Sequence, residues 1–174
     1  MKRNTELKHD ILLIIPPFTQ LNTPYPATAF LKGFLKSRNI SAHQSDIGIE
    51  VINELFSEKG LSELFSIAGK KTAHLSENAA RIVSMRRDYI RAVGPVMSFL
   101  QGKNPTVAEL ICADTFLPES SRFTLADNLE SLFGTMGITD KAKHLATLFL
   151  EDISDMIVEA VDSDAMTQSL RAGK

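Results

Sequence analysis

The chain has 174 residues, of which 44% are hydrophobic, and this is enough to bury a substantial apolar core in one domain or slightly more. Its 19 basic and 21 acidic residues give a net charge of −2, so no surplus of positive charge is available to neutralise a phosphate backbone, and we expect no nucleic-acid partner. The single cysteine, Cys112, excludes an internal disulfide, and also excludes an iron–sulfur cluster or a thiolate zinc site built by this chain alone.

The chain opens with polar and basic residues, which predict a flexible lead-in over residues 1–9. Ile11–Ile15, an uninterrupted aliphatic run, predicts a short strand covered on both faces, as in a parallel sheet. The run is too short to span a membrane, and His9 and Asp10 before it do not fit a signal peptide. Together with the lone cysteine, this predicts a cytoplasmic protein without membrane contact.

A loop, a helix and a second strand are expected next, which gives a β-α-β segment over residues 10–49. Pro16 and Pro17 must end the first strand because neither can donate a hydrogen bond to a sheet. The loop from Pro16 to Pro26 is stiff because its prolines fix φ. Apolar residues at helical spacing predict an amphipathic helix over Ala27–Arg38, with its lysines and arginine on the solvent side. Ile40–Ile47 predicts the second strand.

The remainder of the chain has the period of α-helices and no convincing strand, so residues 50–162 are expected to form a helical region packed on the β-α-β segment. Residues 163–174 lack periodicity and predict a frayed tail. Pro95 is expected to bend one long helix without ending it. The expected helices are Glu50–Phe56, Leu61–Ala68, Ser76–Gln101, Thr106–Ala113 with a short turn of helix at Leu125–Phe133, and Lys141–Val161.

The acidic residues of the last helix favour a solvated face. Metal sites in helical bundles need carboxylates that face inward, whereas these lie opposite the apolar stripe of their helix. The acidic residues are Glu151, Asp155, Glu159 and Asp162, and the stripe is Leu145, Phe149, Ile153, Met156, Ile157 and Ala160.

The other reactive residue types are also better explained by structural roles. His43, His74 and His144 are isolated from any second ligand. Cys112 lies among apolar neighbours and is expected to act as a small buried hydrophobe. A cluster of four arginines could bind an anion, but flanking acidic residues favour intrahelical ion pairs; the arginines are Arg81, Arg86, Arg87 and Arg91, and the acids are Glu77 and Asp88.

The loop after the first strand is the strongest candidate for a ligand site. Ligands of open α/β sheets bind outside the carboxyl ends of the strands, beside helix N-termini. A rigid connector explains the same loop equally well on physical grounds. The sequence has neither a phosphate-binding Gly-x-x-x-x-Gly-Lys loop nor a Gly-x-Gly-x-x-Gly motif after the strand. The candidate residues in the loop are Pro17, Phe18, Thr19, Gln20, Asn22, Thr23 and Tyr25.

This segment resembles the amino-terminal cobalamin-binding domain found in front of many radical S-adenosylmethionine proteins. Those domains read as an aliphatic strand, Pro-Pro, a polar stretch, Pro-Tyr-Pro, an amphipathic helix, and a second strand that ends in Asp. The corresponding residues here are Ile11–Ile15, Pro16-Pro17, Pro24-Tyr25-Pro26, Ala27–Arg38 and Asp46. The resemblance implies a Rossmann-like fold laid against a corrinoid, with the Pro16 to Tyr25 loop near the corrin or its nucleotide tail. It also implies that Asp46 closes the strand edge.

Two departures from the family shape the functional prediction. The Asp-x-His-x-x-Gly motif is absent, so a bound cobalamin would take no histidine ligand from this chain. The Cys-x-x-x-Cys-x-x-Cys cluster motif and the remaining strands of a five-stranded sheet are also missing. We therefore predict a helix-rich α/β protein in which the short parallel β-α-β start of a Rossmann-like sheet precedes a helical bundle-like region.

The function predicted from these observations is that of a cofactor-binding module, or an amino-terminal piece of a radical S-adenosylmethionine protein, that is not catalytic alone. Expected partners are a second copy of the chain, which would extend the small sheet, or a downstream radical domain. The alternative is a helical protein–protein interaction domain without cofactor. A stand-alone enzyme would need a paired nucleophile and base or a metal cluster, and the sequence suggests neither.

Overall fold

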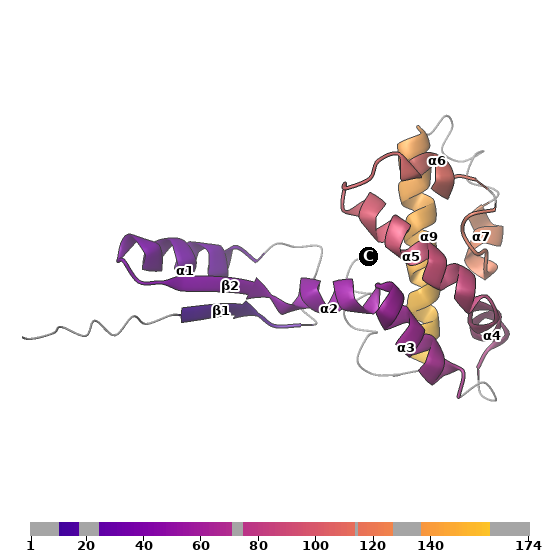
Figure 1. Ribbon diagram of the computed structural model, residues 1–174, viewed down its shortest axis with the longest axis horizontal. Coiled ribbons are helices and arrows are strands. Elements are labelled where there is room, and N and C mark those ends of the chain that lie inside the picture. The colour runs from indigo at the N-terminus through magenta and orange to yellow at the C-terminus, as the bar shows by residue number, and fades with distance from the viewer. Residues whose placement is uncertain (1–10, 18–24, 71–74, 114, 127–136, 161–174) are drawn as a thin grey trace, which may run out of the picture. The chain divides into compact units, whose positions relative to one another are not determined.

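The computed structural model describes residues 11–17, 25–70, 75–113, 115–126 and 137–160 (Figure 1). The fold class agrees with the prediction, since a parallel β1-α1-β2 start is followed by a mostly helical region. The chain forms two compact units, and the boundary between them falls between Asn53 and Glu54. Among the described residues, none of the helices has both the length and the apolar character that a bilayer-spanning segment requires.

The first unit is built on two parallel strands, β1 (Ile11–Ile15) and β2 (Ala42–Asp46), joined through helix α1 (Pro26–Ser37). The strands are in register, with Ile11 opposite Ala42 and Ile15 opposite Asp46. Pro26 occupies the first turn of α1, where its missing N–H costs nothing. Asn39, with φ at 58°, lets the chain reverse after the helix.

The hydrogen bonds around Asn39 are those of a Schellman motif. The Ile40 N–H donates to the Leu35 carbonyl at 3.0 Å, and the Asn39 N–H donates to the Lys36 carbonyl at 3.1 Å. Asparagine tolerates the left-handed conformation better than most residues because its short side chain can bond locally. The helix therefore ends where Asn39 was expected to close it.

The prediction that β1 is covered on both faces is wrong. Its inward positions Ile11, Leu13 and Ile15 are half-buried or buried, but Leu12 and Ile14 are 59% and 47% exposed. Of the described elements, α1 is the one that packs to any extent on the strands, and it supplies a single covering layer. The outer face of this two-stranded sheet is therefore apolar and exposed along β1, whereas along β2 it carries the polar residues His43 and Ser45, which pair with Leu12 and Ile14.

Only part of the apolar pattern of α1 is turned toward the sheet. Thr28 and Leu35 are half-buried toward the sheet, whereas Phe30 is 76% and Phe34 56% exposed. The second strand is shorter than the predicted Ile40–Ile47, because helix α2 (Ile47–Leu55) begins directly after Asp46.

The second unit consists of helices gathered around a central one, α9 (Ile138–Ala160), as Figure 1 shows. Helix α9 packs against each of the other helices of this unit. Its predicted apolar stripe is confirmed, because Phe149, Ile153, Met156, Ile157 and Ala160 are all buried and Leu145 is half-buried. The surrounding helices are α3 (Glu58–Ala68), α4 (Glu77–Ser84), α5 (Arg86–Leu100), α6 (Val107–Ile111) and α7 (Ser121–Ala126).

The single long helix predicted over Ser76–Gln101 is two helices, α4 and α5. They separate at Met85, where φ and ψ are −90° and 14° and the N–H bonds to the carbonyls of both Arg81 and Ile82, as in a tightened turn. Pro95 lies inside α5, which continues through it. The predicted start is correct, since the Ser76 hydroxyl accepts the Ala79 N–H at 3.2 Å.

Two shorter elements also differ from their predicted bounds. The segment expected over Thr106–Ala113 is helical over Val107–Ile111. The turn of helix expected at Leu125–Phe133 begins earlier, at Ser121, and residues 127–133 lie outside the described residues.

Candidate functional site

The carboxyl edge of the sheet brings together two strand ends and two helix beginnings. Ile15 and Asp46 are paired neighbours, so β1 and β2 end at the same level. Helix α1 must start near this edge because it runs back to the beginning of a parallel β2, and α2 starts there directly from Asp46 (Figure 1). This is the position at which α/β sheets bind ligands.

Three of the predicted site residues lie within the described part of this edge. Pro17 is half-buried just after β1, Tyr25 is exposed just before α1, and Asp46 is half-buried at the end of β2. The other predicted residues, Phe18, Thr19, Gln20, Asn22 and Thr23, lie outside the described residues. Their contribution to a site stays a prediction.

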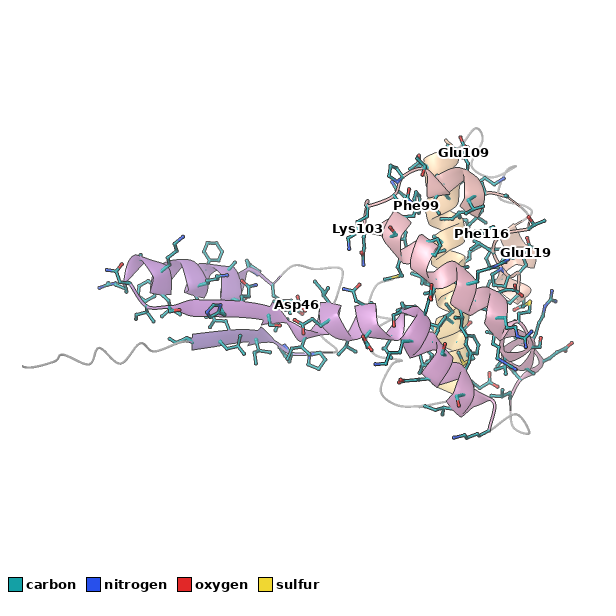
Figure 2. The ribbon with its side chains drawn as sticks, viewed as in Figure 1. Asp46, Phe99, Lys103, Glu109, Phe116 and Glu119 are labelled. Atoms are coloured by element: carbon teal, nitrogen blue, oxygen red, sulfur yellow. The ribbon has the colours of Figure 1, made fainter. Side chains whose placement is uncertain are left out.

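Asp46 has a local partner that the sequence reading did not anticipate. One of its carboxylate oxygens accepts the backbone N–H of Ile49 at 3.1 Å, so Asp46 caps the N-terminus of α2 (Figure 2). The neighbouring Ser45 hydroxyl donates to the carboxylate of Glu50. The anion-binding position of α2 is therefore already filled by a carboxylate of the chain itself.

The N-terminus of α1 is different, because the residue at its capping position does not cap it with its side chain. Tyr25 stands at the capping position, with φ and ψ of −91° and 99°, and makes no side-chain hydrogen bond to the helix. In the first turn, the Thr28 hydroxyl is buried and has no hydrogen-bond partner among the described residues. Uncapped N–H groups and an unsatisfied hydroxyl leave hydrogen-bonding capacity at this end of α1.

A second polar cluster, which the sequence reading missed, lies inside the helical unit. We call it the Asp152 cluster; it comprises Tyr89, Ser120, Arg122, Glu151, Asp152 and Asp155. Asp152 is fully buried, and the Tyr89 hydroxyl donates to it at 3.1 Å. The Arg122 guanidinium donates to Asp155 at 2.6 Å and 2.9 Å and to Glu151 at 3.0 Å, and lies 3.8 Å from Asp152.

Burial controls protonation in the Asp152 cluster. It raises the pKa of Asp152 above its ordinary value, although the surrounding hydroxyls and the Arg122 charge act in the opposite direction. Burial, together with the Asp152 carboxylate, also raises the pKa of Tyr89 far above its usual range. Tyr89 is therefore a neutral hydrogen-bond donor to Asp152 at physiological pH, and the cluster links α5, α7 and α9.

The Asp152 cluster overturns the prediction that the acidic residues of the last helix form a solvated face. Glu151 and Asp155 are half-buried against Arg122 of α7. Glu159, although exposed, accepts hydrogen bonds from the backbone N–H and hydroxyl of Ser76. Glu151, Asp155 and Glu159 thus contact neighbouring segments while remaining partly exposed, and Asp162 lies outside the described residues.

The other candidate residues have ordinary surroundings. His43 is exposed, His144 is half-buried, and His74 lies outside the described residues. Cys112 is half-buried, with its thiol 3.6 Å from the Ile138 carbonyl, and burial raises its pKa, which disfavours a reactive thiolate. Within the described ranges, no three His, Cys, Asp or Glu side chains gather as metal ligands would.

The four arginines of the predicted cluster lie on two helices, Arg81 on α4 and the other three on α5. Arg91 forms the expected intrahelical ion pair with Asp88 at 3.4 Å. Arg81, Arg86 and Arg87 are exposed.

Comparison with known proteins gives no family for this chain. No model of a protein family, no curated protein and no solved structure matches it. A functional proposal therefore depends on the geometry of the carboxyl edge and on the sequence motif at that edge.

Proposed function

We propose that the β1-α1-β2 unit is part of a Rossmann-like sheet that binds cobalamin, and that this chain is a cofactor-binding module without catalysis of its own. The observation that carries the proposal is the register of the strands. Because Ile15 pairs with Asp46, the Pro-Pro loop and the start of α1 share one edge of a parallel sheet. The Pro-Pro, Pro-Tyr-Pro and Asp46 motif falls at that edge.

The chemistry of the edge fits a large ligand with polar substituents. The uncapped N-terminus of α1 and the unpartnered Thr28 hydroxyl offer hydrogen-bond capacity, and the exposed Tyr25 ring offers apolar contact. In this proposal Pro17, Phe18, Thr19, Gln20, Asn22 and Thr23 form the floor of the site, and no histidine of this loop binds the cobalt. A downstream radical domain of a parent protein would supply the reaction.

The open face and edge of the sheet support its extension by further structure. Parallel strands are normally covered on both faces, and a two-stranded sheet is marginal alone. Leu12 and Ile14 leave one face of β1 exposed. We propose that a second copy of the chain or further structure of a parent protein covers this face.

The proposal is tested by mixing the full chain with hydroxocobalamin and following the visible spectrum, with equilibrium dialysis as a second readout. We expect saturable binding that Thr28→Val weakens by about tenfold, because one hydrogen bond to a buried polar group contributes about 1 to 1.5 kcal/mol. The control is His43→Ala, an exposed change on β2 away from the edge. An unchanged spectrum at high protein concentration, with no retention in dialysis, refutes the proposal.

A helical interaction domain without cofactor is the second candidate. It is favoured by the separate core of the second unit, in which α9 is surrounded by five other helices among the described residues. A chain that sediments as a monomer and captures no partner in a pull-down would argue against it.

A further inference from the structure

The side of α1 opposite the sheet carries an exposed aromatic pair that the sheet does not explain. At about 100° per residue, Phe30 lies nearly opposite Thr28 and Phe34 lies about 100° around the helix from Leu35, so both phenylalanines lie away from the two positions half-buried toward the strands, Thr28 and Leu35. Phe30 is the most exposed large apolar residue among those described. Extending or covering the sheet would leave this side of α1 bare, because in α/β folds the outer side of a helix faces away from the strands.

The same side of α1 has small residues next to the two phenylalanines. Gly33 lies in the middle of the helix, where glycine costs about 0.5 to 1 kcal/mol relative to alanine. A Cβ added at Gly33 would meet nothing within 4 Å, so no neighbour in the described chain requires a glycine there. Ala29 and Ser37, one turn before and after it, are also small and exposed. Large side chains beside small ones on a helix surface are what another helix packs against.

The charges around this surface indicate the character of its partner. Lys36 lies on one flank of the outward side and Arg38 on the other, where the Arg38 guanidinium sits 5.4 Å from the centre of the Phe34 ring. Helix α1 contains no acidic residue. Within the described residues, no carboxylate forms an ion pair with Lys32, Lys36 or Arg38. A second copy docking here would bring like charges together, whereas acidic flanks would complement them.

We propose that the outward face of α1, defined by Ala29, Phe30, Gly33, Phe34 and Ser37, docks an acidic amphipathic helix of another protein. The apolar stripe of that helix packs on Phe30 and Phe34 and over Gly33, and its carboxylates lie opposite Lys36 and Arg38. This surface is separate from the carboxyl edge of the sheet, so it does not depend on cobalamin binding.

The test uses the full chain and two fluorescent helical peptides that share a leucine stripe and differ only in their flanks, one with glutamates and one with lysines. By fluorescence anisotropy we expect the glutamate peptide to bind at least about tenfold more tightly, since complementary charges set specificity at an interface. The double variant Phe30→Ser/Phe34→Ser should lose binding. The variant Lys36→Glu/Arg38→Glu should reverse the preference between the two peptides.

The control is Leu110→Ser, which removes an exposed apolar side chain from α6 in the other unit and should leave binding unchanged. Far-UV circular dichroism checks that the variants remain folded, and the charge reversal keeps the test valid if the phenylalanine variant does not fold. Equal binding of both peptides, or no binding, refutes the proposal. The proposal is also refuted if the wild type forms a dimer that dissociates in the phenylalanine variant, because a second copy of the chain then occupies this surface. Binding to phosphatidylglycerol vesicles and to neither peptide makes a membrane the occupant and also refutes it.

Discussion

Asp152 shows how one buried carboxylate can organise three helices. It sits on α9, receives a hydrogen bond from Tyr89 of α5, and lies beside Arg122 of α7, which also holds Glu151 and Asp155. One guanidinium thus faces three carboxylates, of which Asp152 is the most deeply buried. Ionising a buried carboxyl group costs free energy, and leaving it without a hydrogen-bond partner also costs free energy.

We predict that Asp152→Asn leaves the protein at least as stable at pH 7, with a gain of up to about 1 kcal/mol. The amide keeps an acceptor for the Tyr89 hydroxyl and removes the buried charge. Because the folded-state pKa of Asp152 is raised, its protonated form stabilises the fold below the ordinary aspartate pKa, and this contribution is lost as pH rises through the raised value. The variant should therefore lose less stability between pH 4 and pH 7 in urea unfolding.

The control for this prediction is Arg122→Met, which should act in the opposite direction. Removing the guanidinium leaves Glu151, Asp152 and Asp155 without their shared cation, so the variant should be less stable than the wild type at pH 7. The loss of stability should be smaller at low pH. An Asp152→Asn protein that is about 2 kcal/mol less stable than the wild type at pH 7 would show that the ionised carboxylate is a net stabilising group.

At the scale of elements, the corner between α2 and α3 depends on a close backbone approach at Gly60. The Ser57 hydroxyl caps α3 by accepting the Gly60 N–H at 3.0 Å, and it donates to the Glu54 carbonyl at 2.7 Å. A Cβ at Gly60 would lie 2.0 Å from the Glu54 carbonyl oxygen and 2.9 Å from that of Leu55. Both obstacles are backbone atoms, so the corner must open to admit a side chain.

Two glycine-to-alanine substitutions should therefore have opposite signs. Gly60→Ala should destabilise the protein by about 2 kcal/mol or more, because the backbone displacement outweighs the better helix propensity of alanine. Gly33→Ala should stabilise it by about 0.5 to 1 kcal/mol, because its Cβ meets open space. Thermal and urea unfolding measure both, and a Gly60→Ala protein as stable as the wild type would contradict the proposed role of the corner.

The elements also show which features the sequence could reveal. The order β-α-β then helices, the apolar stripe of α9 and the ends of α1 follow from aliphatic runs, helical spacing and a closing asparagine. The break at Met85 could not be foreseen, since neither proline nor glycine marks it. Asp152 could have been found, because it follows Phe149 by three residues and precedes Met156 by four, which places it on the apolar stripe.

For the candidate site, the sequence identified the edge but not the roles of its residues. The pairing of Ile15 with Asp46 follows from two strands separated by one helix. The capping of α2 by Asp46 could not be inferred, because the predicted strand ran one residue too far and hid the start of the helix. The coverage of β1 was predicted wrongly because a run of aliphatic residues indicates a buried strand but does not show which element covers it.

The open face of the sheet should govern self-association of the protein. We predict that Leu12→Thr/Ile14→Thr changes the free energy of unfolding of the monomer by less than about 1 kcal/mol, since both side chains are largely exposed and threonine suits a strand. If a second copy covers this face, the variant should sediment as a monomer where the wild type forms a dimer. A dimer of unchanged affinity would place the contact between copies elsewhere.

The boundary between the two units falls within a continuous helix, since α2 runs from Ile47 to Leu55 and the division lies between Asn53 and Glu54. A helix forms its hydrogen bonds cooperatively, so fraying in the part of α2 that belongs to one unit destabilises the part that belongs to the other. Amide exchange rates along α2 should consequently respond to ligands of either unit. A truncation that separates the two units should therefore keep the whole of α2 in one of the two fragments.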